Sequence, residues 1–353
     1  MVNDLYKRSI QDRGCWGHLP RRIDDYPAPP CGLDGDIRLL TRWISGLGPI
    51  ETSDIARTYE EVMRMLDHNA GAAYDDARWV AIDGPSHVGK TYTIIPVLLR
   101  INDMLLRDER PPKREGVKSV HVPVIYVGDQ GASSKTLVES IAEFAGIFVS
   151  RSDVETTILR RLRTILPLIG CLLIVVDEGH MLRRVGASRD LTDNLRRLLS
   201  LPVSFVFVGA GLRDSALYRR TDVLRVPQSE RPAAARAKPS EGLLDHPDEA
   251  AMQLRNRMKA VQLRAFDSSN SDHLNAWLKR MNGLVSQLER IPGLDVRELK
   301  SREFAVELFT FAQGRTGTSF LILKDVCELA VRRRESPTIQ HLHVEMEKAV
   351  LTP

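Results

Sequence analysis

One stretch, Trp79 to Thr93, constrains the fold more than any other part of the 353-residue chain. It begins with the apolar run Trp79-Val80-Ala81-Ile82. It continues from Gly84 to Thr91 as G-P-S-H-V-G-K-T and leads into a second apolar run at 94–99. This order predicts a buried strand, a glycine-containing loop and the start of a helix, which together form a phosphate-binding P-loop. The alternative, an ordinary turn before a helix, does not require this strand and helix context.

The residue types in the loop suit a nucleoside triphosphate. Backbone N–H groups around the glycines and the positive end of the helix attract an anion. Lys90 is placed to reach the β- and γ-phosphates, and the Thr91 hydroxyl is placed to bind Mg²⁺. We therefore expect ATP and Mg²⁺ as cofactors. The expected nucleotide-binding residues are Gly84, Pro85, Ser86, His87, Val88, Gly89, Lys90, Thr91 and Tyr92.

A second informative stretch is Cys171 to Glu178, C-L-L-I-V-V-D-E. Its continuous apolar run predicts a central strand covered on both faces. The two carboxylates follow at the carboxyl end, where ligands bind in open α/β sheets. We expect Asp177 to bind the metal and Glu178 to polarise the attacking water. An acidic pair can also cap a following helix, but after a P-loop a Walker B element is the better interpretation.

Composition restricts the class of protein. The hydrophobic content of 43% and the charged content of 27% are those of a soluble globular protein. The net charge of +4 permits nucleic-acid binding without demonstrating it. The four cysteines are scattered without metal-ligand spacing, so we expect reduced thiols and no zinc site. We see neither a signal peptide nor a membrane-spanning run, which predicts a cytoplasmic protein without membrane partners.

The order of elements predicts an α/β doubly wound parallel sheet with a small C-terminal all-α lid. We expect an irregular N-terminal arm over 1–52, containing a short helix at 37–44, and an ATPase core over 53–227. The segment 228–271, rich in proline, alanine and charge, predicts a mobile insertion, and 272–353 predicts the helical lid. The expected strands are 79–82, 120–127, 171–177, 202–209 and 222–226.

The sequence resembles the AAA+ ATPases, and within them the TniB/TnsC-type transposition regulators, relatives of IstB and MuB. The resemblance covers Asp54 to about Ala349. It includes the P-loop, the strand ending in Asp177-Glu178, the strand S-F-V-F-V-G-A-G and the lid-like stretch from Phe311 to Glu345. The P-loop and acidic pair occur in very many NTPases, whereas their spacing and the lid pattern indicate transposition ATPases.

This resemblance implies a function. It implies an ATPase that assembles as a ring or filament of identical subunits on double-stranded DNA. It also implies that the assembly marks an insertion site with a target-selection protein and activates a DDE-type transposase. ATP hydrolysis to ADP and phosphate would disassemble the oligomer. In the family a neighbouring subunit supplies an arginine to the γ-phosphate, and Arg219 and Arg220 occupy the matching segment.

Two departures from the family pattern concern hydrolysis. His87 stands where many AAA+ loops carry Gly or Asn, and Gly209-Ala210 stands where a polar sensor residue is expected. In the lid, Arg315 and Lys324 are weak candidates for the second sensor. These departures predict slow hydrolysis, or hydrolysis stimulated by DNA or a partner.

Basic clusters are the candidate DNA contacts, with solvated helix faces as the alternative. The candidates are Lys135, Arg160, Arg161, Arg163, Arg183 and Arg184.

Two other functions compete with transposition: a signalling or defence P-loop NTPase that switches a protein partner, and a small-molecule P-loop kinase. The first usually carries appended domains, and the second needs no acidic pair after a buried strand.

Overall fold

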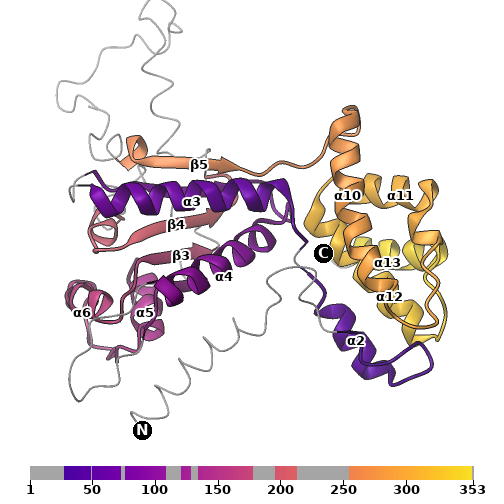
Figure 1. The fold of residues 1–353 in the computed structure, drawn as a ribbon, viewed down its shortest axis with the longest axis horizontal. Coiled ribbons are helices and arrows are strands. Elements are labelled where there is room, and N and C mark those ends of the chain that lie inside the picture. The colour runs from indigo at the N-terminus through magenta and orange to yellow at the C-terminus, as the bar shows by residue number, and fades with distance from the viewer. Residues whose placement is uncertain are drawn as a thin grey trace, which may run out of the picture. The chain divides into compact units, whose positions relative to one another are not determined.

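The computed structural model describes residues 28–48, 50–72, 76–108, 121–128, 134–177, 195–212 and 254–351. These residues fall into two units (Figure 1). The sheet unit contains Thr58–Gly84 and Arg100–Gln262, and the helical unit contains Gly17–Arg57, Pro85–Leu99 and Leu263–Pro353. The loop predicted to bind phosphate and the first half of the helix that follows it thus belong to the helical unit.

Five parallel strands form the sheet, in the order β2-β3-β4-β1-β5. Their bounds are β1 Trp79–Asp83, β2 Val124–Gly128, β3 Leu173–Asp177, β4 Ser204–Gly209 and β5 Met258–Gln262. Every residue of β1, β3 and β4 is buried, as expected for central strands with both faces covered. This confirms the predicted α/β P-loop fold, with a doubly wound parallel sheet and C-terminal helices.

The strand register aligns the carboxyl ends of the strands. Asp83 pairs in register with Gly209 on one side and with Gln262 on the other. Asp177 pairs with Gly128. Asp177 therefore ends its strand at the same edge of the sheet at which the chain leaves β1 toward the loop.

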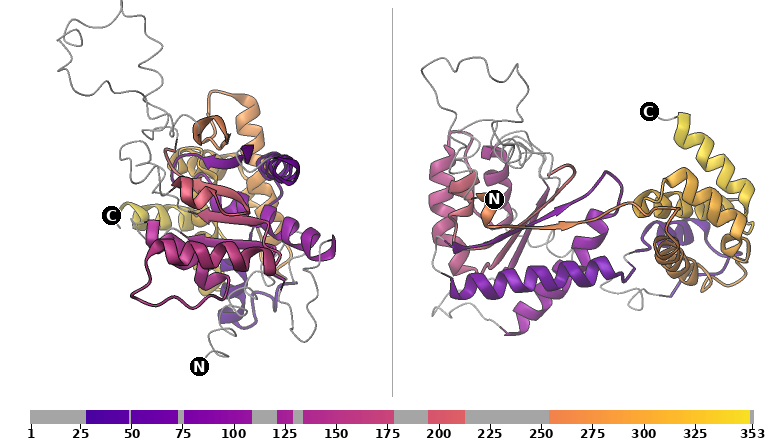
Figure 2. Two further views of the ribbon diagram at one scale, coloured as in Figure 1. Left: turned by 90° about the vertical axis from the view of Figure 1, so that its left-hand side faces the viewer. Right: turned by 90° about the horizontal axis from the view of Figure 1, so that it is seen from above.

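Helices cover both faces of the sheet within this unit (Figure 2). Helices α5 (Ser134–Phe144) and α6 (Glu155–Leu168) pack on the face that carries Trp79, Phe205 and Phe207. Parts of α3 (Ser53–Gly71) and α4 (Lys90–Asp108) lie at the other face, where Asn69 of α3 donates to the Ser204 hydroxyl over 2.9 Å. Buried aliphatic and aromatic side chains from both layers stabilise the sheet.

Strand β5 was not predicted. It lies inside the segment predicted as an insertion, so 258–262 belongs to the sheet. The expected strand 222–226 lies outside the described residues and stays a prediction. Only Val261 of β5 is buried. Because an edge strand buries few side chains, its sequence lacks the apolar run used to find the other strands.

The helical unit has its own core, built around Trp277, Phe304 and Val326. Its helices are α2 Ile37–Ser45, α10 Ser271–Leu288, α11 Arg302–Ala312, α12 Thr316–Arg332 and α13 Ile339–Leu351, with a short 3₁₀ helix at Glu298–Lys300. Burial in this core raises the pKa of the Cys327 thiol, which suits a packing role rather than a reactive one.

Helix α2 lies where the sequence predicts a short helix, at 37–44, within the N-terminal segment. Asp36 caps it, and its carboxylate accepts from Arg38 N over 2.8 Å. Leu40, Trp43 and Ile44 are buried in the same core as α10 and α12. This part of the N-terminal segment therefore belongs to the helical unit and contributes to its stability.

Candidate nucleotide-binding site

The loop between Pro85 and Gly89 contains two residues with left-handed backbone. His87 has φ of 60° and Gly89 has φ of 100°, and α4 begins directly afterwards at Lys90. Left-handed backbone favours Gly and Asn and is also adopted by His more often than by most residues. This explains why His87 can occupy a position at which related loops carry Gly or Asn.

Lys90 folds back over its own loop. Its ammonium Nζ donates to the carbonyl oxygen of Pro85 over 2.7 Å. Behind it, Thr93 closes the first turn of α4 through its amide and hydroxyl, which bond to the Gly89 carbonyl at 2.9 and 3.0 Å. The positive charge is thus held at the mouth of the turn, where the phosphates of a nucleotide would attract it.

The first turn of α12 packs tightly on the same loop. A Cβ atom on Gly317 would lie 2.5 Å from the His87 carbonyl oxygen and 3.4 Å from Gly89 N. Only glycine fits there without a shift of backbone. Beside this contact lies a cavity of about 20 Å³, lined by Thr52, Tyr92 and Phe320 among others. That volume suits roughly one water molecule.

One half-buried cation next to the loop, Arg280, was not singled out in the sequence. Arg280 of α10 donates to Asp54 over 2.7 Å and to the Thr316 hydroxyl over 3.3 Å, and its guanidinium lies 4.6 Å from the Phe266 ring centroid. Nothing in the sequence distinguishes Arg280, because α10 shows only the apolar spacing of a helix that packs on a core.

Lys324, a weak candidate for a second sensor, is 7% exposed. It donates to the Ser45 carbonyl over 3.1 Å and to the Tyr92 hydroxyl over 2.9 Å. The carbonyl end of α2 favours this positive charge. The ammonium therefore links α12 to α2 and to the first turn of α4. Arg315, the other weak candidate, precedes α12 and makes no side-chain cap bond.

In the sheet unit, Asp177 is a buried carboxylate at the end of β3. It is 5% exposed, and the Tyr126 hydroxyl donates to its Oδ2 over 2.7 Å. Tyr126 was missed in the sequence because nothing in it shows which strand neighbours β3. A residue of β2 two positions before its end becomes informative only when the register is known.

Asp83 and Gly209 lie side by side at the ends of β1 and β4. Asp83 Oδ1 accepts from the Leu212 amide over 3.0 Å. A Cβ atom on Gly209 would lie 2.9 Å from the Leu212 side chain. The turn after β4 thus packs over the position at which the family pattern has a polar sensor, so the described residues offer none at that position.

Several predicted site residues lie outside the described part of the chain: Glu178, Arg183, Arg184, Arg219 and Arg220. Their roles remain predictions. Among the described candidates for DNA contacts, two are paired within the protein. Arg161 donates to both oxygens of Asp153, at 2.7 and 3.2 Å, and Lys135 lies 3.5 Å from Glu139.

The two predicted metal ligands carry oxygen donors, a carboxylate on Asp177 of the sheet unit and a hydroxyl on Thr91 of the helical unit, and oxygen atoms are the ligands that Mg²⁺ prefers. No cluster of three His, Cys, Asp or Glu side chains with metal-binding geometry occurs among the described residues. No described helix is long and apolar enough to cross a bilayer.

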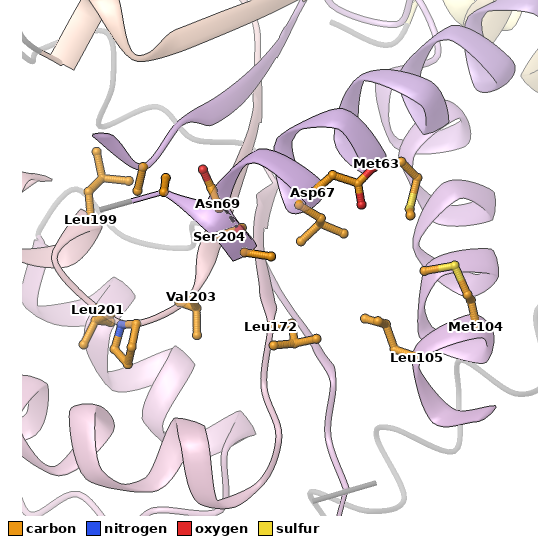
Figure 3. A pocket seen from close by; sticks show the side chains of 15 residues that line it. Met63, Asp67, Asn69, Met104, Leu105, Leu172, Leu199, Leu201, Val203 and Ser204 are labelled. Carbon is orange, nitrogen blue, oxygen red and sulfur yellow. Dashed lines mark hydrogen bonds between the residues drawn. The ribbon is translucent and has the colours of Figure 1, made fainter. Parts of the chain in front are cut away.

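A larger cavity lies elsewhere in the sheet unit (Figure 3). Its volume is about 580 Å³, and Met63, Met104 and Leu172 contribute to a mostly apolar lining. It borders Ser204, the first residue of β4, and therefore lies toward the amino ends of the strands. It is separate from the strand ends that carry Asp83 and Asp177.

The sheet order, the loop before α4 and the C-terminal helices together form an α/β fold of the P-loop class. A solved structure of Aeropyrum pernix Orc1 in complex with DNA has this fold, with a TM-score of 0.53 and 17% identity. The alignment covers 84% of this chain and 64% of that chain, so this chain spans less than two thirds of the Orc1 length.

Two further solved structures match less closely. Caenorhabditis elegans PCH-2 has a TM-score of 0.44 and 11% identity, with 86% of this chain and 69% of that chain covered. Drosophila ORC bound to DNA has a TM-score of 0.36 and 13% identity, with 83% and 67% covered. No protein-family model matches the chain, and no curated protein matches it.

Proposed function

We propose that this protein is an ATP-dependent, DNA-binding regulator of transposition. It binds ATP and Mg²⁺ and assembles with further copies of itself on double-stranded DNA. With a target-selection protein, the assembly marks the insertion site and activates a DDE-type transposase. The observation that carries the nucleotide part is the turn at His87–Gly89, followed at once by Lys90 at the start of α4.

The proposed chemistry assigns one role to each polar group. The loop amides and Lys90 bind the phosphates, and Thr91 and Asp177 hold Mg²⁺, which neutralises charge on the transferred phosphoryl group. Glu178 orients the attacking water. Arg219 or Arg220 of a neighbouring copy stabilises the charge that develops on the γ-phosphate.

DNA binding is supported by an arginine surface on the sheet unit, formed by Arg160, Arg163, Arg196 and Arg197. Arg163 Nη2 donates to the Ser200 hydroxyl over 2.6 Å, which brings α6 next to the turn that follows Arg197. All four arginines are exposed. Neither Arg160 nor Arg197 has an ion-pair partner among the described residues.

The sequence segments that carry these arginines contain long stretches without acidic residues. The sequence contains no Asp or Glu at 156–176 or at 195–212. The exposed residues Thr156 and Thr164 also lie on α6, and the Thr164 hydroxyl donates to the Arg160 carbonyl over 3.3 Å. Arginine guanidinium and hydroxyl groups are the usual side-chain partners of DNA phosphates. The arginine surface therefore replaces Arg161 and Lys135, which are paired, as the proposed contact with duplex DNA.

One experiment tests the proposed function as a whole. ATP binding and hydrolysis are measured with and without duplex DNA, for the parent protein and for Lys90→Ala. We expect the parent to bind ATP, to hydrolyse it faster with DNA and to form an ATP-dependent oligomer visible by electron microscopy. Lys90→Ala should lose nucleotide binding, whereas the exposed-lysine control Lys279→Ala should retain it. ATP affinity of Lys90→Ala equal to that of the parent would remove the P-loop assignment.

The main alternative is a signalling or defence NTPase that switches a protein partner. It predicts nucleotide binding with hydrolysis that is indifferent to DNA. The same measurement therefore separates the two functions.

A further inference from the structure

The pairing of β2 with β3 places Tyr126 close to the metal-binding carboxylate. Gly128 is the register partner of Asp177, and Tyr126 is opposite Val175. Since side chains alternate along a strand, Tyr126, Gly128 and Asp177 project from the same face of the sheet. The Tyr126 side chain must therefore extend along the strand by the spacing of two residues, about 6.6 Å, to meet Asp177.

Gly128 lies beside Asp177 on β2 and carries no side chain, and a Cβ atom there would meet no heavy atom of the described residues within 4 Å. The partner of Asp177 on β2 is therefore Tyr126, whose hydroxyl makes the 2.7 Å bond to Asp177 Oδ2. The half-buried Tyr126 ring fixes the direction of this donor.

The choice of donor matters for the chemistry. A buried carboxylate needs hydrogen-bond partners, because burial without them is costly. An arginine or lysine partner would place a positive charge where the metal cation binds. The phenol is neutral, so it holds the carboxylate in one orientation and leaves its negative charge for the cation. Groups of this kind around metal ligands typically change metal affinity or activity by about 10- to 100-fold when they are removed.

We propose that Tyr126 is a positioning residue that orients Asp177 for Mg²⁺. This inference rests on the proposed ATP-binding function. Tyr126 touches neither nucleotide nor metal in this role and acts only through the Asp177 carboxylate. Its loss should weaken Mg²⁺ binding without weakening the metal-independent part of nucleotide binding.

The test compares Tyr126→Phe with the parent and with the control Tyr59→Phe, which removes a tyrosine hydroxyl on α3. A fluorescent ATP analogue is titrated in EDTA and at increasing Mg²⁺ concentrations, and ATP hydrolysis is followed over the same Mg²⁺ range. For Tyr126→Phe we expect unchanged analogue affinity in EDTA. The Mg²⁺ concentration at half-maximal effect should rise by about 10- to 100-fold in both measurements. Tyr59→Phe should match the parent.

Asp177→Asn separates the two ways in which this can fail. If Asp177→Asn loses the Mg²⁺ effect and Tyr126→Phe keeps it at the parental concentration, Tyr126 only packs and the inference is wrong. If Asp177→Asn also keeps the Mg²⁺ effect, the assignment of Asp177 as a metal ligand fails and the inference fails with it. A Tyr126→Phe protein with lower affinity in EDTA as well would indicate a general structural role and would overturn the inference.

Discussion

Arg280 and Asp54 form an ion pair of 2.7 Å between α10 and the first turn of α3, inside the helical unit. The two side chains are only 12% and 21% exposed. Arg280 also donates to the hydroxyl of Thr316, which begins α12 beside the phosphate-binding loop. One guanidinium thus connects three helices next to the proposed nucleotide site.

We predict that Arg280→Ala lowers the free energy of unfolding by about 2 to 3 kcal/mol, because the largely buried bonds from Arg280 to Asp54 and to Thr316 are lost, while Asp54 keeps only its more exposed pair with Arg57 at 2.9 Å. The control is Arg297→Ala, whose side chain is 91% exposed in its pair with Asp295. It should change stability by no more than about 0.5 kcal/mol. Urea unfolding followed by circular dichroism measures both. Equal effects would show that the Arg280 pair contributes no more than a surface pair.

A second prediction concerns Glu178, which follows β3 directly. Glu178→Gln should bind ATP like the parent and fail to hydrolyse it, because an amide of similar volume cannot polarise the attacking water. The variant should therefore accumulate as a DNA-bound oligomer in ATP, detectable by sedimentation with duplex DNA. A hydrolysis rate equal to that of the parent would assign the catalytic role to another residue.

The arginine surface predicts a salt-dependent contact with DNA. Each phosphate contact adds about −0.9 to the slope of log affinity against log salt. The variant Arg160→Ala/Arg163→Ala/Arg197→Ala should therefore bind duplex DNA more weakly in the ATP state and lose about 2 to 3 units of that slope. Sequence preference among duplexes should be unaffected. Fluorescence anisotropy across a salt series measures both quantities.

The matched control carries the same loss of charge on the helical unit, Arg38→Ala/Arg42→Ala/Arg302→Ala, at three exposed arginines. It should leave the slope unchanged. If the parent binds DNA and both triple variants bind equally well, the contact lies elsewhere. If the parent itself does not bind at low salt, the DNA-binding function is wrong.

The fourth prediction tests whether neighbouring copies share the nucleotide site. Arg219→Ala/Arg220→Ala should bind ATP normally and lose most turnover, by roughly 10³-fold if one of them stabilises the γ-phosphate charge. Mixing it with Lys90→Ala, which retains both arginines, should restore part of the activity. A double variant that assembles and hydrolyses like the parent would exclude both arginines, and Arg213 would be tested next.

The last prediction concerns pH. Burial raises the pKa of Asp325 to about 6, with further contributions from Glu345 and Glu328 that Lys348 and Lys324 oppose. The unfolded chain has a pKa near the ordinary value, so the folded state binds this proton more tightly. Stability is therefore favoured below about pH 4 and falls as pH rises through 6. Asp325→Asn should remove this loss and stabilise the protein by about 1 kcal/mol at pH 7, with no gain at pH 4. Thermal unfolding at both pH values measures the difference, and an equal shift at both would contradict the assignment.

The sequence by itself determined the elements whose signal is local. The apolar run before Gly84, the glycine spacing and Lys90 predict a strand, loop and helix because each requirement falls within a few neighbouring residues. The buried run ending at Asp177 and the helical periodicity of α3, α10 and α12 are of the same kind. These features were sufficient for the fold class.

Only the tertiary structure decided which residues meet across the chain. Val261 lies in an edge strand that buries too few side chains to show an apolar run. Asp153 neutralises Arg161, and Tyr126 bonds to Asp177, because helix packing and strand register bring them together. Such contacts depend on the order of strands in space, which no local pattern encodes. The sequence therefore identified the charged side chains, and the packing decided which of them are paired with other residues of the protein.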